Sequence, residues 1–319
     1  MNKNNKIKFG KFYSQYSYIF SFILLAIIAT YFNPSFLSYS NLSTLLLQST
    51  IKGIIAMGMA LIIISGQIDL SVGSLCALTA GLGVVVLNST GSAALMLAFC
   101  LVFGTFLGTV NGLFITKGKI APFIVTLATM SAYRSIIVQL GQGGPFNVEA
   151  SLIGSFRMIA AGETFGIPNL AIVFIGTAIA MAILMNKTKL GRYIYAVGSN
   201  EKAAKLNGVN VNRVKTLTYS ITGLLTGLSA FLLSSRLTSI TAANAGTAFE
   251  MDAIAAVAIG GTSMSGGRGR IIGTFLGAIM LQMIEGILIA AKIPPFLNGL
   301  VKGVIIIVAV LIQRKKESN

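Results

Sequence analysis

Repeated apolar stretches of about 20 residues constrain the fold of this chain more than any other feature. A helix of that length crosses the hydrocarbon core of a bilayer, where the backbone must satisfy its own hydrogen bonds. The sequence therefore predicts an all-α fold, a polytopic membrane helix bundle with about ten transmembrane segments. They cover roughly 18–31, 43–65, 70–88, 93–116, 120–139, 167–185, 214–235, 251–267, 271–291 and 295–312, of which 251–267 is short enough to cross incompletely.

Charge predicts the orientation of this bundle. The chain has 24 Lys and Arg against 8 Asp and Glu, and most basic residues fall in alternate loops and at both ends. Because Lys and Arg concentrate in cytoplasmic loops, both termini are expected in the cytoplasm. Residues 1–17 and 313–319 would be basic cytoplasmic tails around one transmembrane domain, 18–312. The net charge of +16 follows from this asymmetry and does not indicate nucleic-acid binding.

Several kinds of chemistry have no support in the sequence. There is no histidine, and the two cysteines, Cys76 and Cys100, lie in apolar runs where they are expected to pack as small residues. No phosphate-binding G-x-x-x-x-G-K-[ST] motif occurs, and no catalytic or metal-binding motif was found. We therefore expect no enzyme active site, metal site or cofactor in this chain.

Glycine is abundant, with 35 residues, many of them inside the predicted spans. Two examples are the pairs at Gly104 and Gly108 and at Gly223 and Gly227. Small residues let helices approach closely in lipid, where apolar side chains gain little by leaving the lipid tails. These pairs predict a closely packed bundle.

The longest polar segment between predicted spans is 186–213. A short helix within it has both ends marked: Ser199 or Asn200 can cap the first turn, Glu201 suits the helix dipole there, and Gly208 can end the helix in a left-handed conformation. A capped cytoplasmic helix between two spans is expected to be presented to a partner. An ordinary solvated basic loop is the alternative.

Glycine and proline interrupt the apolar pattern in related ways at several places. Segment 65–73 resembles 259–267, and 119–123 resembles 292–296. Paired interruptions in two halves of a chain indicate a transport pathway in repeat-built transporters. The predicted orientation puts both glycine segments at the cytoplasmic side but separates the other two, so one simple duplication does not explain all four.

Ionisable residues inside spans are expected to face a bundle interior or a cavity, because an unpaired charge in lipid is costly. For Asp69 and Glu285 a polar pathway and structural pairing are equally good interpretations, and Glu285 and Lys302 lie in adjacent predicted helices where they can pair. For the basic residues, pairing or snorkelling to an interface is the favoured interpretation. The residues concerned are Lys52, Asp69, Arg134, Glu285 and Lys302, with Asp252 at the edge of a span.

Four stretches together resemble the permease subunits of bacterial ABC importers for ribose and related monosaccharides. They are Gly66–Gly73, Pro122–Leu127 with Met130, Tyr133 and Arg134, Gly191–Gly198 continuing to Ala204, and Asp252–Val257 continuing to Gly267. Their order and spacing fit that family over most of the chain. One departure is Gln67, where the family often has a second glycine, and this adds bulk at a break.

The resemblance implies a multi-pass protein of the bacterial inner membrane that works with three partners. They are a second permease copy, a cytoplasmic ATPase that holds ATP and Mg²⁺, and an extracytoplasmic sugar-binding protein. It also implies that the short cytoplasmic helix docks on the ATPase. The expected ATPase-coupling residues are Gly198, Ser199, Asn200, Glu201, Lys202, Ala203, Ala204, Lys205 and Gly208.

A neutral sugar fits the small number of intramembrane charges. Hydroxyl, amide and carboxylate groups at the two glycine interruptions would hydrogen-bond a polyol on its path. The expected substrate-path residues are Gln67, Asp69, Ser71, Thr262, Ser263 and Ser265.

Alternatives remain open on the sequence alone. An ion-coupled secondary transporter acting alone would use Asp69 and Glu285 as its buried acids, but it would leave the capped cytoplasmic helix without a role. A membrane-embedded enzyme or scaffold is a third class. Within the importer class, a nucleoside or a furanose-type signal molecule is an alternative substrate.

Overall fold

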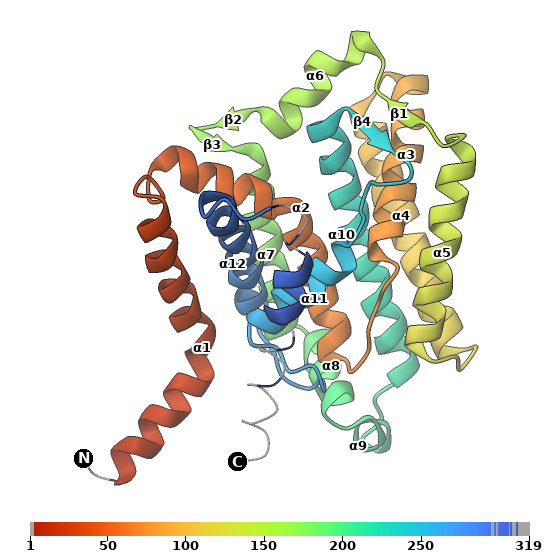
Figure 1. The fold of residues 1–319 in the computed structure, drawn as a ribbon. Helices are drawn as coiled ribbons and strands as arrows, with labels where there is room; N and C mark the ends of the chain where they lie inside the picture. Colours follow the sequence, from red (N-terminus) through yellow and green to blue (C-terminus); the bar gives the residue numbers. More distant parts are fainter. Residues whose placement is uncertain (1–2, 295–296, 298, 306, 308–310, 312–319) are drawn as a thin grey trace.

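Helices make up most of the protein. A computed structural model describes residues 3–294, 297, 299–305, 307 and 311. The long helices run side by side between two ends of the molecule, with α6 and the short strands at one end and α8 and α9 at the other (Figure 1). The bounds of the helices are α1 Lys3–Phe32, α2 Tyr39–Ile64, α3 Val72–Thr90, α4 Ala93–Thr116, α5 Pro122–Leu140, α6 Ala150–Ala161, α7 Asn169–Lys187, α8 Lys189–Ser199, α9 Glu201–Leu206, α10 Val211–Leu237, α11 Phe249–Ile259 and α12 Ile271–Ala290.

Four very short strands interrupt the predicted all-α fold. The strand β1 (Pro145–Asn147) pairs antiparallel with β4 (Ser239–Thr241), and β2 (Glu163–Thr164) pairs antiparallel with β3 (Ile167–Pro168). They lie in the loops at the end of the bundle that carries α6 (Figure 1). They fix these loops without adding a sheet to the core, so the polytopic helix bundle is confirmed.

The expected spans agree with the helices to differing degrees. Within the described residues, 7 helices are long and apolar enough to cross a membrane: α2, α3, α4, α5, α7, α10 and α12. Tyr18–Phe32, the apolar part of α1, is a shorter candidate. The helix starts at Lys3, so it includes most of the stretch expected as a tail. Residues 299–305 are helical, but part of the expected span 295–312 lies outside the described residues, as does the tail 313–319.

The expected span 251–267 is wrong as a continuous helix. The 11-residue helix α11 ends at Ile259, and no helix follows until Ile271. Its glycines explain the early end, because Gly261 adopts a left-handed backbone with φ +81°, and the N–H of Thr262 bonds back to the carbonyl of Val257. The segment 260–270 is therefore an interruption at the end of the bundle that carries α8.

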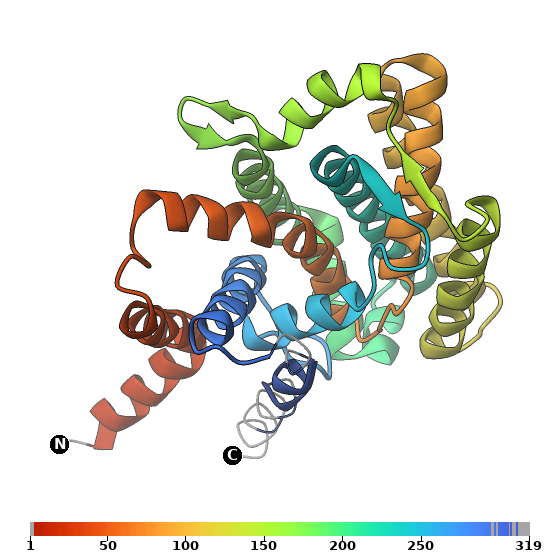
Figure 2. The same ribbon diagram turned by 45° about the horizontal axis from the view of Figure 1, so that its top comes forward.

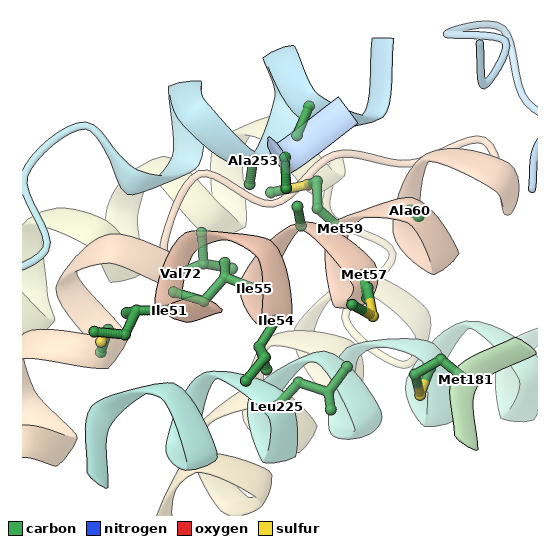
Figure 3. Packing of buried hydrophobic residues seen from close by; sticks show 14 of the residues in the cluster. Ile51, Ile54, Ile55, Met57, Met59, Ala60, Val72, Met181, Leu225 and Ala253 are labelled. Atoms are coloured by element: carbon green, nitrogen blue, oxygen red, sulfur yellow. The ribbon is translucent and has the colours of Figure 1, made fainter. Parts of the chain in front are cut away.

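Helix α2 forms the centre of the core. From Ile54 to Ile64 every residue is buried, so this helix is apolar on all sides and surrounded by other helices. Ile54 lies against Leu225 of α10 in the close view of the packing (Figure 3). Because water and lipid are both excluded here, α2 and α10 form a scaffold on which the other helices are placed.

The glycine pairs predicted to pack helices pack against each other. A Cβ atom at Gly104 of α4 would collide with the carbonyl oxygen of Gly223 on α10, and one at Gly223 would collide with the backbone of Gly104. Gly108 and Gly227 continue the same contact along the two helices. The prediction of close helix packing by small residues is confirmed.

The outer helices show their apolar side chains to the surroundings. On α7, Ile172, Ile175, Ile179 and Ile183 are exposed and recur at helical spacing, which forms a stripe suited to lipid tails. Helix α1 lies at the edge of the bundle, where it contacts α12 (Figure 2).

Candidate functional site

The predicted short helix is confirmed as α9. The side chain of Asn200, rather than that of Ser199, caps it by accepting a 2.9 Å hydrogen bond from the N–H of Ala203. After the helix, Gly208 takes the expected left-handed conformation, with φ +79°. Five of the six residues of α9 are exposed, and Leu206 is 88% exposed, so α9 presents an apolar tip to the surroundings.

A second helix in the same polar segment was not predicted. Helix α8 begins after Thr188, whose side chain accepts a hydrogen bond from the N–H of Gly191, and it buries Ile194 and Val197 against the bundle. The spacing of Leu190, Ile194 and Val197 is the signal that would have identified it. Helix α8 connects the exposed α9 rigidly to the bundle.

The end of α8 touches two interruptions that lie far apart in the sequence. A Cβ atom at Gly198 would collide with the carbonyl oxygen of Ile64, the last residue of α2, and would stand 2.8 Å from the nitrogen of Gly267. The N–H of Gly267 in turn donates a 2.9 Å hydrogen bond to the carbonyl of Ile64. The backbone around Gly198 therefore joins α9, the segment after α2 and the segment after α11.

A side chain of α8 strengthens this junction. The Tyr195 hydroxyl donates a 2.8 Å hydrogen bond to the carbonyl of Gly269, in the segment that follows α11. Burial raises the pKa of the Tyr195 hydroxyl above its ordinary value, so the group stays protonated and remains a donor. Sequence inspection did not single out Tyr195, although it is a polar aromatic residue on the apolar face of a helix.

The interruption after α2 leads into a buried polar network. Asp69 accepts hydrogen bonds from both the N–H and the hydroxyl of Ser71, at 2.8 and 2.7 Å. Asn111 of α4 donates a 2.8 Å bond to the Ser71 hydroxyl and accepts a 3.3 Å bond from Tyr133 of α5. The network fixes the start of α3 against α4 and α5, and polar residues within apolar spans were the signal for Asn111 and Tyr133.

The expected substrate-path residues divide into two groups. Asp69 and Ser71 lie fully buried in the network just described. Ser263 and Ser265 lie on the other interruption, with their hydroxyls 2.8 Å apart. The two segments approach each other near the junction, where a Cβ atom at Gly266 would stand 3.0 Å from the Cα of Gly66.

Two of the expected path residues bury polar side chains. The side-chain amide of Gln67 and the hydroxyl of Thr262 are buried and have no hydrogen-bond partner among the described residues. A buried polar group without a partner costs about 1–3 kcal/mol. Both residues follow a left-handed glycine at the end of a helix, Gly66 with φ +80° and Gly261 with φ +81°. The resemblance between 65–73 and 259–267 therefore reflects a shared way of ending a helix.

The segment between β4 and α11 is the inverted counterpart of the interruption after α2. After α10 and β4 the chain turns back into the bundle, and α11 begins where α3 begins: Gly246 and Gly73 are in backbone contact. Helices α3 and α11 leave this point toward opposite ends of the molecule. The two members of the other predicted pair share a local conformation, since Lys119 and Lys292 both adopt left-handed backbones, with φ 55° and 57°.

Four charged residues form one cluster inside the bundle. Lys302 lies 2.6 Å from Glu285 and 2.7 Å from Asp252, which confirms the expected pair of Glu285 with Lys302. Lys52 lies 2.7 Å from Asp252 and 3.5 Å from Glu285. The cluster has two positive and two negative charges, so it is neutral as a whole, and it ties α2, α11, α12 and the helical residues 299–305 together.

Interrupted helices that meet inside a membrane bundle, and a capped helix that projects from one end of it, define a transport permease. Residues 41–310 match the family described as branched-chain amino acid transport system / permease component, and the chain belongs to this family of ABC-importer permeases. It is a multi-pass membrane subunit of a bacterial importer. Permeases of this class generally work with an ATPase and a binding protein.

Several curated relatives cover nearly the whole chain. The ribose import permease protein RbsC of Bacillus subtilis (strain 168) is 42% identical over 295 residues, which is 92% of this chain and 91% of the relative. RbsC of Escherichia coli (strain K12) is 39% identical over 311 residues, covering 95% of this chain and 94% of the relative. The L-arabinose transport system permease protein AraH of Escherichia coli (strain K12) is 33% identical over 313 residues, covering 98% and 94%.

Proposed function

We propose that this chain imports a neutral monosaccharide of the ribose type, as one of two permease copies driven by a separate ATPase. The observation that carries the mechanism is the junction at Gly198, which connects the exposed helix α9 by backbone contact to both interruptions of the bundle. A displacement of α9 therefore reaches the segments that precede α3 and follow α11.

The substrate class comes from the relatives. They are named as permeases for ribose, L-arabinose and xylose, whereas the family description names branched-chain amino acids. The sugar permeases are similar over at least 86% of this chain, so we assign a pentose rather than an amino acid. A nucleoside or a furanose-type signal molecule is the second candidate, because either presents a similar sugar ring.

Coupling to the ATPase follows from the exposed face of α9. The residues 198–205 and Gly208 form the proposed docking segment, with Leu206 as its apolar tip. Closure of the ATPase would press on α9, and α8 would transmit the movement through Gly198 to Ile64 and Gly267. Docking shifts the equilibrium between outward-open and inward-open states only if these contacts differ between the two states.

The orientation of the bundle agrees with this scheme. The start of α1 lies at the same end of the molecule as α8 and α9 (Figure 1), so a cytoplasmic N-terminus puts α8 and α9 on the side of the ATPase and α6 with the short strands outside. The outer loops would then meet the binding protein that delivers the sugar.

The test is import by the reconstituted complex. The chain is reconstituted in proteoliposomes with its ATPase and its binding protein, and ATP is supplied on the side of the membrane that the ATPase occupies. Uptake of labelled ribose, arabinose, xylose and leucine is then measured. We expect uptake of a pentose that stops when the ATPase is omitted. Uptake by the chain alone, driven by an ion gradient, would instead identify a secondary transporter, and uptake of leucine alone would exclude the sugar assignment.

Docking of α9 is tested separately by substitution of its apolar tip. Leu206→Glu should release the ATPase during co-purification, because it places a charge in the contact. Phe165→Glu is the matched control, since Phe165 is 99% exposed and lies between β2 and β3 at the other end of the bundle. It should leave ATPase binding unchanged.

A further inference from the structure

A cleft lies where α3 and α11 begin. It has a volume of about 380 Å³, within the range of roughly 300–1,000 Å³ that small-molecule sites occupy. Helix α5 forms one wall, and the start of α3 with the segment leading into α11 forms the other. Its lining residues are Ser74, Met130, Ser131, Arg134, Ser135, Gly246, Thr247, Ala248 and Glu250.

Most of the residues that line the cleft carry polar side chains. Four hydroxyl groups, one guanidinium and one carboxylate face the same space, while only Met130 and Ala248 add apolar side chains. Helix α5 is one of the helices long and apolar enough to cross a membrane, yet it leaves Ser131 and Ser135 exposed on this face. Polar side chains on a helix of this kind are expected to face a cavity or a path.

Arg134 and Glu250 are the two charged groups of the cleft. One guanidinium nitrogen of Arg134 donates a 2.8 Å hydrogen bond to the carbonyl of Ala242, which fixes the side chain and leaves its other donors available. Glu250 lies in the first turn of α11, and its Oε2 would stand 2.6 Å from a Cβ atom at Gly73.

These two charges do not neutralise each other by direct contact. The ion pairs found among the described residues link Lys52, Lys215 and Lys302 to acids, and none joins Arg134 to Glu250. They are nevertheless close enough to interact electrostatically. The cleft thus offers hydrogen-bond donors from Arg134 and acceptors from Glu250, with no net charge from the pair.

That combination suits a neutral polyol. Each sugar hydroxyl is both a donor and an acceptor, so neighbouring hydroxyls can accept from a guanidinium and donate to a carboxylate, while serine and threonine hydroxyls complete the set. A branched-chain amino acid would also satisfy both charges, but only Met130 and Ala248 offer apolar side chains to its own side chain.

We propose that the cleft is a sugar subsite on the translocation path, in which Arg134 and Glu250 bind adjacent hydroxyls of the monosaccharide. This inference rests on the proposed function, the import of a monosaccharide. It assigns recognition inside the bundle to residues that differ from the expected path residues at the two glycine interruptions. The subsite also lies where Gly73 contacts Gly246, so a relative movement of α3 and α11 changes its shape.

The experiment uses the reconstituted importer with its ATPase and binding protein. Uptake of labelled ribose, arabinose and xylose is compared for the unchanged chain, Glu250→Gln and Arg134→Lys, which keep size or charge but alter the bonding pattern. We expect uptake to fall at least 10-fold and the ratio of ribose to xylose uptake to change at least 2-fold. Lys117→Gln and Arg213→Lys, both exposed at the end of the bundle that carries α8, are the matched controls and should leave that ratio unchanged.

A second measurement covers the case in which these variants fail to assemble. Ser135→Cys places a thiol on the exposed α5 wall, while the native Cys76 and Cys100 are buried. Its modification by a water-soluble thiol reagent should slow at least 2-fold when the assembled importer is turning over with saturating pentose.

The outcomes separate the subsite from the proposed function. Unchanged uptake and sugar ratio in both cleft variants, or modification of the Ser135→Cys thiol that pentose does not slow, would overturn the subsite and leave the import function intact. Protection by leucine but not by pentose would also overturn it. Failure of the unchanged complex to import any of the three sugars would instead refute the proposed function itself.

Discussion

The N–H of Gly267 donates a 2.9 Å hydrogen bond to the carbonyl oxygen of Ile64, which joins the segment after α11 to the end of α2. Gly198 at the end of α8 lies against both residues. The three segments are far apart in the sequence, and each begins or ends at an interruption of a helix. In the proposed coupling scheme, the junction is the place where movement of α8 and α9 reaches the bundle.

The first prediction concerns Gly198. Gly198→Ala places a methyl group against the carbonyl of Ile64, and overpacking of this kind typically costs about 1–3 kcal/mol. We expect α8 to shift away from the junction, so that sugar uptake falls severalfold while the ATPase still co-purifies and hydrolyses ATP. Uptake and ATP hydrolysis are measured together in proteoliposomes.

The matched control for this change is Gly176→Ala. Gly176 lies on α7, and no atom outside its own helix stands within 4 Å of the position that a Cβ atom would occupy. This variant should keep normal uptake per ATP hydrolysed. Equal behaviour of the two variants would contradict the role of the junction.

The second prediction concerns the charge cluster. Lys302→Met removes the only cation that lies within 3 Å of both Glu285 and Asp252 among the described ion pairs. The cost should lie between the roughly 1 kcal/mol of an exposed pair and the 3–5 kcal/mol of a fully buried one, because Lys302 and Glu285 side chains are 17% and 19% exposed. The thermal midpoint of the detergent-solubilised protein should fall.

A double-mutant cycle isolates the interaction. Adding Glu285→Gln to Lys302→Met should cost less than the sum of the two single changes, since the second change removes a carboxylate that the first left unpaired. Lys292→Met, at an exposed position, is the control and should have little effect. Strictly additive costs would show that the cluster does not act as a unit.

The third prediction concerns the two groups of expected path residues. Ser71→Ala deprives Asp69 and Asn111 of a shared hydroxyl, so it should impair uptake and reduce stability by about 1–3 kcal/mol. Ser263→Ala removes a hydroxyl that lies 2.8 Å from that of Ser265 near the junction, and it should also impair uptake. ATPase binding should be intact in both variants. Normal uptake would remove the corresponding residue from the path.

The sequence predicted local features well because their causes are local. Length and apolarity predict a spanning helix, and the cap at Asn200 with the glycine at Gly208 predicts α9. The pairing of Glu285 with Lys302 could also be predicted, since two opposite charges in neighbouring spans have few other partners. These predictions need no knowledge of how distant segments meet.

Features set by tertiary contact could not be predicted in the same way. The expected span 251–267 combined a short helix with a glycine-rich segment because both are apolar or small. Segment 65–73 was paired with 259–267 through shared residue types, whereas the inverted relationship with the segment before α11 depends on backbone direction and leaves little trace in composition. The neighbourhood of Arg134 and Glu250 likewise arises only when α5 and α11 are placed beside α3.

The fourth prediction concerns the cap of α9. Asn200→Ala leaves the first turn without its side-chain acceptor, which typically costs a helix about 1 kcal/mol. If α9 must be helical to dock, that cost appears in binding as about a fivefold weaker affinity for the ATPase, because 1.4 kcal/mol corresponds to a factor of ten. The affinity is measured by titrating labelled ATPase onto the permease in nanodiscs.

Ser92→Ala removes a comparable cap from α4 at the other end of the bundle and should leave the affinity unchanged, which separates docking from a general loss of stability. An unchanged affinity for Asn200→Ala would mean that the ATPase does not depend on this cap, and the proposed contact would have to lie on α8 or elsewhere.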